Sequence, residues 1–414
     1  MATSFLIVTS ALTAMLVSIL IYPLGLHYAR RHNIVDNPGA RKLQRVPIPV
    51  FGGVVVYSGI VAGNLYLSLM IESPVMSWTM LAMTVMLVIG TWDDIKDLPP
   101  TGRLLVELLV VGGFILATGN IINNFHGLWG IHELPAYVSI PLSLLAGVGI
   151  INAVNLIDGV DGYASGYGMM ACLFFGIMFW TVWSPRIVCM NFIVMGALLP
   201  FFMHNVFGVK SKMFIGDGGT LMLGTLMTVL VFCALTGETR SCRLETINVG
   251  MLAFTLAVLC IPVFDTLRVM TARIVRGNSP FHPDKTHLHH LFVDMGFSHL
   301  GAALFILMLN VGVVLIWFIS WKMGASIDVQ TYVVVALGVF VTFGFYKLMR
   351  CQQNGGPKDE DGFPQGTRLW HLMCRLGWHT HRENKRMWRT MRYLMDGPLY
   401  GGYKERIKRR LRKG

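Results

Sequence analysis

Charged residues are scarce in this sequence, where they make up 14% of 414 residues. A soluble protein of this length carries about a quarter of its residues as Asp, Glu, Lys or Arg, so the shortage excludes an ordinary soluble enzyme. Cysteine is scarce too. There are seven, and only Cys242 falls in a loop on the outer side of the arrangement derived below, so no structural disulfide is expected. Hydrophobic residues, in contrast, make up 54% of the sequence.

Long apolar runs account for this composition. A membrane-spanning helix needs about 20 mainly apolar residues, and eleven segments come near that length. They lie at residues 3–26, 49–71, 76–92, 103–119, 137–154, 164–184, 187–205, 213–236, 246–267, 299–321 and 327–349. The run 103–119 contains Glu107 and is the weakest of them. We therefore predict an all-α, polytopic membrane protein with about 11 transmembrane helices.

The basic residues are divided unevenly between the two sides of this arrangement. One set of alternate loops, together with the C-terminal segment, holds 30 of the 34 Lys and Arg residues, and the other loops hold four. Without the residues from Lys347 onward the division is still 13 to 4. Because loops rich in Lys and Arg stay in the cytoplasm, we predict the N-terminus outside and the C-terminus in the cytoplasm. The net charge of +12 then favours anionic lipid over nucleic acid as a partner.

Acidic and amide side chains lie where four of the apolar runs begin or end, all on the predicted cytoplasmic side. The residues are Asp93 and Asp94 after the third run, Asn152, Asn155, Asp158 and Asp161 around the end of the fifth, Asp217 in the eighth and Asp265 near the end of the ninth. A single such residue is equally well explained by a wet helix end. Four groups on one face favour a functional site, because acidic groups beside membrane helices are costly.

This set of ligand atoms indicates a particular kind of metal. Carboxylate and amide oxygens without thiolates are hard ligands, which suit Mg²⁺ or Mn²⁺ better than zinc. Mg²⁺ is usually held by one or two carboxylates and by phosphates of the substrate. A substrate with a diphosphate is the natural inference.

Two further segments carry polar side chains near the same face. The segment 276–290 contains prolines that prevent a continuous helix, and it ends in His287, His289 and His290. Their spacing fits no common zinc site, so contact with phosphate or sugar, acid–base catalysis and a structural polar loop remain the alternatives. The glycine-rich segment 216–219 leads into a helix and can present backbone N–H groups to a phosphate.

Taken in order, these motifs resemble the polyprenyl-phosphate N-acetylhexosamine-1-phosphate transferases, of the glycosyltransferase family 4 type, over residues 1–350. The matching motifs are Asp36-Asn37-Pro38 with Arg41-Lys42, Pro47-x-Pro49, Gly52-Gly53, Asp93-Asp94, Asn152-x-x-Asn155-x-x-Asp158-Gly-x-Asp161-Gly162, Phe214-x-Gly216-Asp217-x-Gly219-Thr220, Pro262-x-x-Asp265-x-x-Arg268 and Ser279-Pro280-Phe281-x-Pro283-Asp284-x-x-His287-x-His289-His290. One position departs from the family, because Gln44 stands where a histidine usually follows the Arg-Lys pair.

The histidine pattern is similar to that of the bacterial branch that uses UDP-GlcNAc and undecaprenyl phosphate. The resemblance implies a Mg²⁺-dependent transfer of GlcNAc-1-phosphate to the lipid with release of UMP, which begins a cell-envelope glycopolymer. It also implies a multi-pass protein of the bacterial inner membrane with its active site on the cytoplasmic face. The phospho-N-acetylmuramoyl-pentapeptide transferases are the alternative within the family, although they carry three adjacent histidines.

The resemblance also implies roles for individual residues. Asp217 and Asp158 would hold the metal, with Asn152 and Asn155 helping to place the diphosphate. Asp161 and Phe214 would hold the uridine. Asp93 and Asp94 would orient the lipid phosphate or act as a base. The remaining roles are contact with the diphosphate and sugar for Arg268, His287, His289 and His290, and attraction of the lipid phosphate for Arg41 and Lys42.

The C-terminal part lies outside the resemblance. Residues 351–367 form a polar linker, and residues 368–414 carry 14 Lys and Arg residues interleaved with tryptophan, methionine and leucine. We predict basic amphipathic helices that lie on anionic lipid of the inner leaflet, with a partner-binding tail as the alternative. The sequence leaves the oligomeric state open, with a homodimer as one alternative.

A secondary transporter is the rival class of protein. Transporters place broken helices and ionisable groups near the middle of the bilayer, often within inverted repeats. Here the ionisable groups lie at helix ends and no repeat is visible. The enzyme is therefore the favoured interpretation.

Overall fold

The computed structural model describes residues 2–38, 46–71, 73–182, 184–237, 242–280, 286–355, 368–382 and 385–396. The helices are α1 (Ala2–Arg31), α2 (Gly52–Ser68), α3 (Pro74–Lys96), α4 (Pro100–Thr118), α5 (Ala136–Leu156), α6 (Tyr163–Thr181), α7 (Pro185–Phe207), α8 (Gly216–Leu235), α9 (Cys242–Glu245), α10 (Met251–Val258), α11 (Cys260–Val275), α12 (Leu288–Asp294), α13 (His299–Lys322), α14 (Ile327–Val339), α15 (Tyr346–Gly355), α16 (Arg368–Arg382) and α17 (Lys385–Met395). The remaining elements are the short helices η1 (Leu128–Gly130) and η2 (Phe340–Phe345) and the antiparallel strands β1 (Val35–Asp36) and β2 (Ile48–Pro49).

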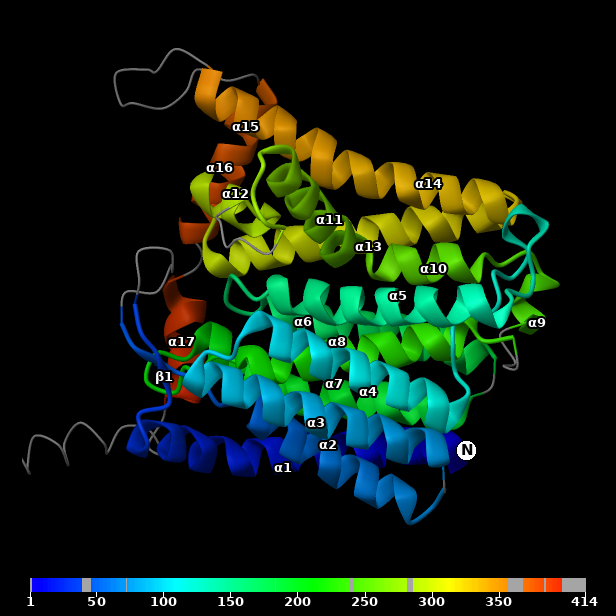
Figure 1. The fold of residues 1–414 in the computed structure, drawn as a ribbon. Helices are drawn as coiled ribbons and strands as arrows, with labels where there is room; N and C mark the ends of the chain where they lie inside the picture. The colour runs from blue at the N-terminus through cyan, green and yellow to red at the C-terminus, as the bar shows by residue number, and fades with distance from the viewer. Residues whose placement is uncertain are drawn as a thin grey trace, which may run out of the picture.

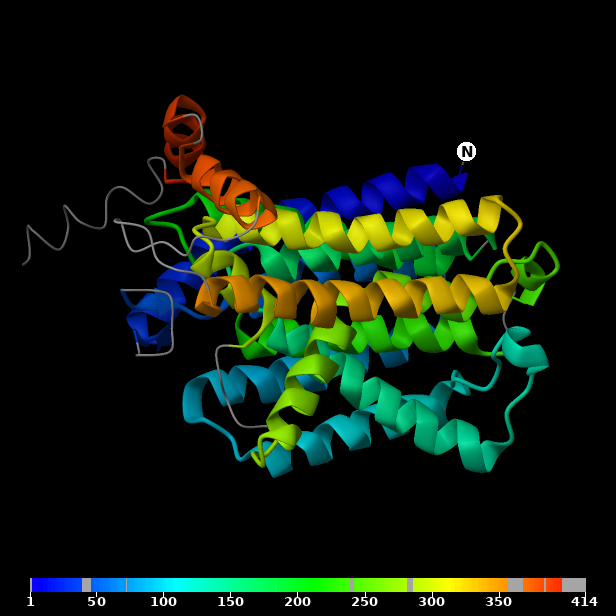
Figure 2. The same cartoon turned by 90° about the horizontal axis from the view of Figure 1, so that it is seen from above.

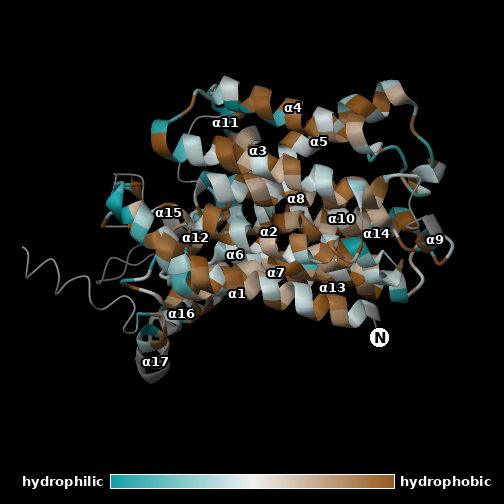
Figure 3. Ribbon diagram, turned by 90° about the horizontal axis from the view of Figure 1, so that it is seen from below, coloured by the Kyte–Doolittle hydropathy of each residue, from teal (hydrophilic) through white to brown (hydrophobic). Residues whose placement is uncertain are grey.

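Most of the long helices run side by side along one direction (Figure 1). Within the described ranges, nine helices are long and apolar enough to cross a membrane, or ten if the bent pair α10–α11 is one span. The predicted all-α polytopic membrane protein is thereby confirmed. Hydrophobic residues cover the lengths of the helices, while hydrophilic ones lie mostly toward their ends (Figure 3).

The expected number of eleven spans is not reproduced, and the difference lies in the run 49–71. Its helix α2 has only 17 residues, because the run begins in strand β2 and ends in a turn. The helix nevertheless runs beside α1 and α3 across the bundle, and α1 begins at the end opposite to α15 (Figure 1). The start of α1 and helix α15 lie at opposite ends of the bundle, as the predicted topology requires. Which of these ends is cytoplasmic stays a prediction from charge.

Helix α8 occupies the centre of the bundle. Every residue of its most apolar stretch is buried by protein, and it packs against α2, α3, α5, α6 and α10. An all-round hydrophobic sequence suits such a position, because no face of the helix meets a polar surface. Asp217 lies at the N-terminal end of this central helix.

Glycines let two helices approach the start of α8. A Cβ at Gly53 of α2 would lie 2.5 Å from the backbone N of Gly219, and a Cβ at Gly90 of α3 would lie 2.6 Å from the backbone of Asp217. The loop before α8 is also tied to β2, since the N–H of Phe214 donates to the carbonyl of Pro49 at 2.8 Å. The backbone around Asp217 is therefore fixed by direct contact with three other elements.

The bend between α10 and α11 measures 72°. Broken helices inside a membrane need substitutes for their missing backbone hydrogen bonds. Asn310 of α13 supplies them: its Oδ1 accepts from the N–H of Ile261 at 3.0 Å, and its Nδ2 donates to the carbonyls of Ala257 and Val258 at 3.2 and 3.1 Å. One buried amide thus stabilises the bend that directs α11 away from the line of α10.

The C-terminal helices α16 and α17 lie at the same end of the bundle as β1 and the start of α8 (Figures 1 and 2). The predicted linker 351–367 begins inside α15, which continues to Gly355, and its residues 356–367 lie outside the described part. The six cysteines that the structure describes in full are unpaired, and the side chain of Cys242, on which the sequence prediction depends, is not described.

Candidate active site

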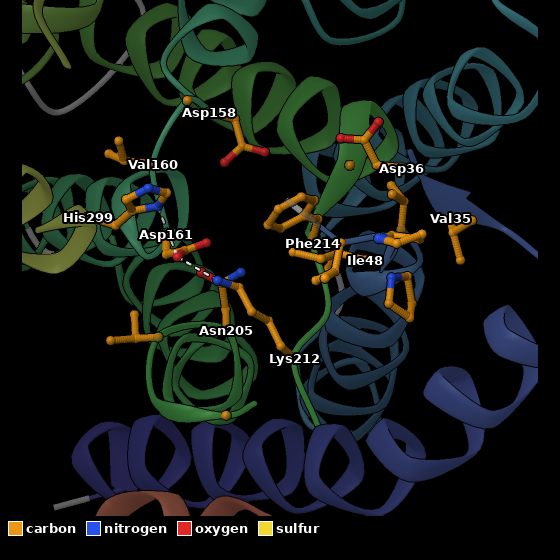
Figure 4. Close-up of a pocket in the computed structure, with 18 of the residues that line it drawn as sticks. Val35, Asp36, Ile48, Asp158, Val160, Asp161, Asn205, Lys212, Phe214 and His299 are labelled. Atoms are coloured by element: carbon orange, nitrogen blue, oxygen red, sulfur yellow. Dashed lines mark hydrogen bonds and ion pairs between the residues drawn. The ribbon is translucent and has the colours of Figure 1, made fainter. Parts of the chain in front are cut away.

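A pocket of about 950 Å³ opens at the end of the bundle where α3, α5 and α7 finish and α8 begins. Acidic side chains from four segments line it, as Figure 4 shows for part of the wall. They are Asp36, Asp93, Asp94, Asp97, Asp158, Asp161 and Asp217. The sequence motifs predicted that the acidic groups at Asp93, Asp94, Asp158, Asp161, Asp217 and Asp265 would meet at one face. The structure brings all of them except Asp265 into one pocket, whereas Asp265 is buried and does not line it.

Arg103, at the start of α4, links several of these groups. Its Nη1 donates to Asp93 Oδ2 at 3.2 Å and lies 3.8 Å from Asp217 Oδ2, while its Nη2 donates to Asn152 Oδ1 at 3.0 Å. Its Nε lies 3.3 Å from the buried Glu107, which also accepts a hydrogen bond from Asn152. The fork-shaped guanidinium suits such a junction, and it explains why Glu107 can lie inside an apolar run.

Asp217 is held on both its backbone and its side chain. Its N–H donates to Asp94 Oδ1 at 2.9 Å, and the N–H of Gly218 donates to Asp94 Oδ2 at 3.2 Å. Its Oδ1 accepts from Asn155 Nδ2 at 2.8 Å, and Asn155 also donates to the hydroxyl of Thr220 at 2.8 Å. Gly216, with a φ of 74°, adopts the left-handed backbone that glycine permits. The side chain of Asp217 is 42% exposed and lines the pocket.

Asp158 lies in the connection between α5 and α6 and opens onto the pocket. Its desolvation among protein atoms and the charges of Asp217, Asp161 and Asp36 raise its pKa to about 7. Mutual repulsion of this kind is relieved when a cation lies between the carboxylates. Asp158 and Asp217 therefore fit a divalent cation whose remaining ligands come from a substrate. Within the described ranges no three His, Cys, Asp or Glu side chains are grouped as a complete metal site.

A second group of polar residues surrounds Asp161. Lys212 Nζ donates to Asp161 Oδ2 at 2.6 Å, and His299 Nδ1 lies 3.0 Å from the same oxygen. Burial opposes ionisation here, but the bonds from His299 and Lys212 lower the pKa of Asp161. The ammonium of Lys212 also lies 5.8 Å above the centre of the Phe214 ring. These side chains face one another across one side of the pocket (Figure 4).

The histidine segment divides between the pocket and the interior. His290 lines the pocket, whereas His287 and His289 are buried. His287 Nδ1 lies 3.0 Å from Asp265 Oδ2, and burial beside His290 and His287 lowers the pKa of His289 well below its usual value. Arg268 is buried as well and donates to Asp265 Oδ1 at 2.7 Å. Among the expected diphosphate contacts, only His290 reaches the pocket wall in this structure.

Several predicted residues are placed differently, or lie outside the described part. Arg41 and Lys42, like Gln44, fall in residues 39–45, which the structure does not describe. Asn152 and Asn155 support the acidic residues and do not themselves line the pocket. The structure adds Arg103, Lys212 and His299, which the motifs had not singled out.

The chain is similar in sequence to known glycosyl transferases. The family model described as glycosyl transferase family 4 matches residues 76–235. A probable undecaprenyl-phosphate N-acetylglucosaminyl 1-phosphate transferase of Bacillus subtilis (strain 168) is 29% identical over 339 residues, which cover 81% of this chain and 88% of the relative. An undecaprenyl-phosphate alpha-N-acetylglucosaminyl 1-phosphate transferase of Escherichia coli O157:H7 is 29% identical over 277 residues, covering 65% and 72%. The chain is thus similar to glycosyl transferase family 4 over residues 76–235 and, over most of its length, to undecaprenyl-phosphate N-acetylglucosaminyl 1-phosphate transferases.

Proposed function

We propose that this enzyme transfers GlcNAc-1-phosphate from UDP-GlcNAc to undecaprenyl phosphate and releases UMP. The observation that carries the proposal is the meeting of Asp158, Asp161 and Asp217 in one pocket at the helix ends. The names of the relatives agree with this choice of sugar and lipid. A site on the cytoplasmic face of a bacterial inner membrane would meet the nucleotide sugar where such substrates are found.

The reaction is a substitution at phosphorus. An oxygen of the lipid phosphate forms a bond to the phosphorus that carries the sugar, and the bond from that phosphorus to the UMP oxygen breaks, so UMP leaves with the bonding electrons. The lipid phosphate needs little activation, because the second pKa of a phosphate monoester is about 6. Positioning and charge neutralisation then supply most of the catalysis.

The described residues divide this work between them. Asp217 and Asp158 would hold Mg²⁺ or Mn²⁺, which neutralises negative charge that develops on the diphosphate. Asn155 and Asp94 keep the side chain and backbone of Asp217 in place. Beside Asp161, the ammonium of Lys212 and the aromatic ring of Phe214 would contact the nucleotide. Asp93, fixed by Arg103, is placed to orient the lipid phosphate.

Turnover by the purified full-length protein tests the proposal. UMP release should require UDP-GlcNAc, undecaprenyl phosphate and Mg²⁺ together, and omission of any one should abolish it. A panel with UDP-GalNAc and UDP-MurNAc-pentapeptide tests the sugar, since a preference for the pentapeptide would assign the other branch. Absence of product with every UDP-N-acetylhexosamine, from protein shown to be folded, would overturn the proposal.

A second assay separates direct transfer from a covalent route. If a carboxylate first took the phosphosugar, radiolabelled UMP would exchange into UDP-GlcNAc without any lipid. Direct attack by the lipid phosphate predicts no such exchange. Labelled UDP-GlcNAc in the lipid-free reaction would therefore replace the direct mechanism with the covalent one.

A further inference from the structure

Helix α17, near the C-terminus, forms part of the pocket wall. Trp388 and Arg392 of this helix line the same pocket as Asp158 and Asp217. The ring of Trp388 lies 5.1 Å from that of Phe207, at the end of α7. A helix that lay only on a lipid surface would have no reason to supply pocket residues, so its position calls for a role in the site.

Asp396, directly after α17, anchors this helix to the connection between α7 and α8. Its carboxylate accepts hydrogen bonds from three successive backbone N–H groups, those of Val209 at 3.0 Å, Lys210 at 3.0 Å and Ser211 at 2.9 Å. The hydroxyl of Ser211 donates to it as well, at 2.9 Å. Successive amides that converge on one carboxylate form a specific anion-binding turn. The contact is therefore built for Asp396 and does not depend on general attraction of a basic helix.

The connection that Asp396 holds leads directly to two pocket residues. Lys212 follows Ser211 and donates to Asp161, and Phe214 stands two residues further on. At its other end the connection is tied by the bond from the Phe214 N–H to the carbonyl of Pro49. With both ends fixed, the position of the Lys212 side chain depends on the contact at Asp396.

Charge supports the same conclusion. Arg30, Lys212 and Arg392 are the basic side chains that line the pocket in the described ranges. Arg30 donates to the carbonyl of Lys210 and Lys212 donates to Asp161, whereas the guanidinium carbon of Arg392 lies 5.9 Å from the centre of the Trp388 ring. A guanidinium held over a ring at a pocket wall is suited to bind a phosphate group.

A smaller cavity of about 370 Å³ adjoins this wall. Trp388 lines it together with Asp161, His299 and Phe297. The indole therefore lies between the acidic residue that Lys212 engages and a second space beside α13. This arrangement places α17 next to the Asp161 side of the site.

We propose that α17 is a wall of the nucleotide-sugar site, in which Asp396 positions Lys212 and Phe214 and Arg392 attracts the diphosphate. The proposal rests on the proposed function, because the ligand concerned is the nucleotide sugar. It differs from the expectation that the basic tail serves only to bind anionic lipid.

Steady-state kinetics of full-length variants test it. Asp396→Ala should raise the KM for UDP-GlcNAc by about tenfold, while kcat stays within about threefold and the KM for undecaprenyl phosphate is unchanged. Asp396→Asn keeps the shape of the side chain and loses its negative charge, so the KM for UDP-GlcNAc should rise less than in Asp396→Ala. Arg392→Gln should also raise this KM. Arg375→Gln, at an exposed arginine of α16 outside the pocket, is the matched control and should behave as the wild type.

Hydrogen exchange gives a readout that does not need turnover. In Asp396→Ala the amides of residues 209–211 should exchange faster, and those of α8 should not change. If the wild type is inactive with every nucleotide sugar but this exchange pattern is found, the docking of α17 stands and the proposed function fails. If the wild type is active and Asp396→Ala has unchanged kinetics, the inference is overturned. Equal losses in Arg392→Gln and Arg375→Gln that appear only in vesicles with anionic lipid would also overturn it, in favour of a membrane contact.

Discussion

The carboxylate of Asp94 accepts the backbone N–H of Asp217 at 2.9 Å. A side chain at the end of α3 therefore caps the first turn of α8, where Ile215, in the N-cap position, supplies no side-chain hydrogen bond. The first N–H groups of a helix lack partners within it and favour a negative charge. The pair explains how an acidic residue of one motif orients the acidic residue of another.

Loss of this cap should weaken the fold as well as the chemistry. Asp94→Ala is expected to lower the free energy of unfolding by about 0.5–2 kcal/mol, the usual cost of removing an N-cap, and to reduce turnover. Thermal unfolding in detergent measures the first effect, with Asp294→Ala as a control because Asp294 makes an exposed ion pair with Arg350. An unchanged melting temperature with lost activity would show that Asp94 acts on the substrate directly.

Asp217→Asn should leave the fold intact and abolish turnover. The amide oxygen can still accept from Asn155, but it is a poorer ligand for a hard cation. We expect a loss of about 100-fold or more in kcat, the scale on which removal of one charge-stabilising group acts. Mg²⁺ should raise the melting temperature of the wild type and have no effect on the variant. A fully active variant would refute the metal assignment.

The raised pKa of Asp158 predicts a pH dependence. Since that pKa is about 7, a proton occupies the carboxyl increasingly below pH 7 and competes with the cation. The Mg²⁺ concentration for half-maximal activity should therefore rise as the pH falls from 8 to 6. Titrations with Mg²⁺ at pH 6, 7 and 8 measure it. A requirement for Mg²⁺ that is independent of pH would exclude Asp158 as a ligand.

Arg103→Lys should show that geometry matters beyond charge. Lysine has one ammonium group and cannot reach Asp93, Asn152 and Glu107 together as the guanidinium does. We expect kcat to fall by about 10–100-fold, as positioning errors of this size commonly cause. Arg186→Lys, at the start of α7, is the control of the same type. Wild-type kinetics of Arg103→Lys would mean that a positive charge alone is sufficient.

Two glycines give a direct test of the packing around α8. Alanine at Gly90 would push its Cβ to 2.6 Å from the backbone of Asp217, whereas a Cβ at Gly113 would meet nothing within 4 Å. Gly90→Ala should destabilise the protein by about 1–3 kcal/mol, as overpacking does. Gly113→Ala should be neutral or stabilising, by up to about 1 kcal/mol. The melting temperatures of the two variants test this prediction. Similar values for Gly90→Ala and Gly113→Ala would contradict the close packing of α3 on α8.

The sequence predicted the general fold and most of the acidic pocket for a simple reason. Each motif follows or precedes an apolar run that is long enough to span the membrane. Because consecutive spans cross in opposite directions, the end of one span and the start of the next lie on the same side of the membrane. This reasoning located Asp93, Asp158 and Asp217 without any knowledge of tertiary structure. It also counted α2 as a full span, because hydropathy does not show that strand β2 takes up the beginning of the run.

The supporting residues could not be found in this way. In the sequence Arg103 is only the first residue of the apolar run 103–119, and the packing of α4 against α3 and α5 brings it to Asp93. His299 has no motif around it and meets Asp161 because α13 begins beside the α5–α6 connection. Likewise, the histidine pattern does not reveal that His287 turns inward to Asp265. Such contacts depend on side-chain direction in three dimensions, which a linear pattern does not contain.

The complete enclosure of α8 has a consequence for how the protein is made. During insertion the early helices enter the membrane before α10 exists, so α8 must first face lipid on the side that α10 later covers. The apolar residues all around α8 permit this temporary exposure. The same helix begins at Asp217, and the pocket also takes His299 from α13 and Trp388 from α17, so it is completed only after these later helices have been made. A chain arrested before that step would hold its acidic residues in the membrane without a working site.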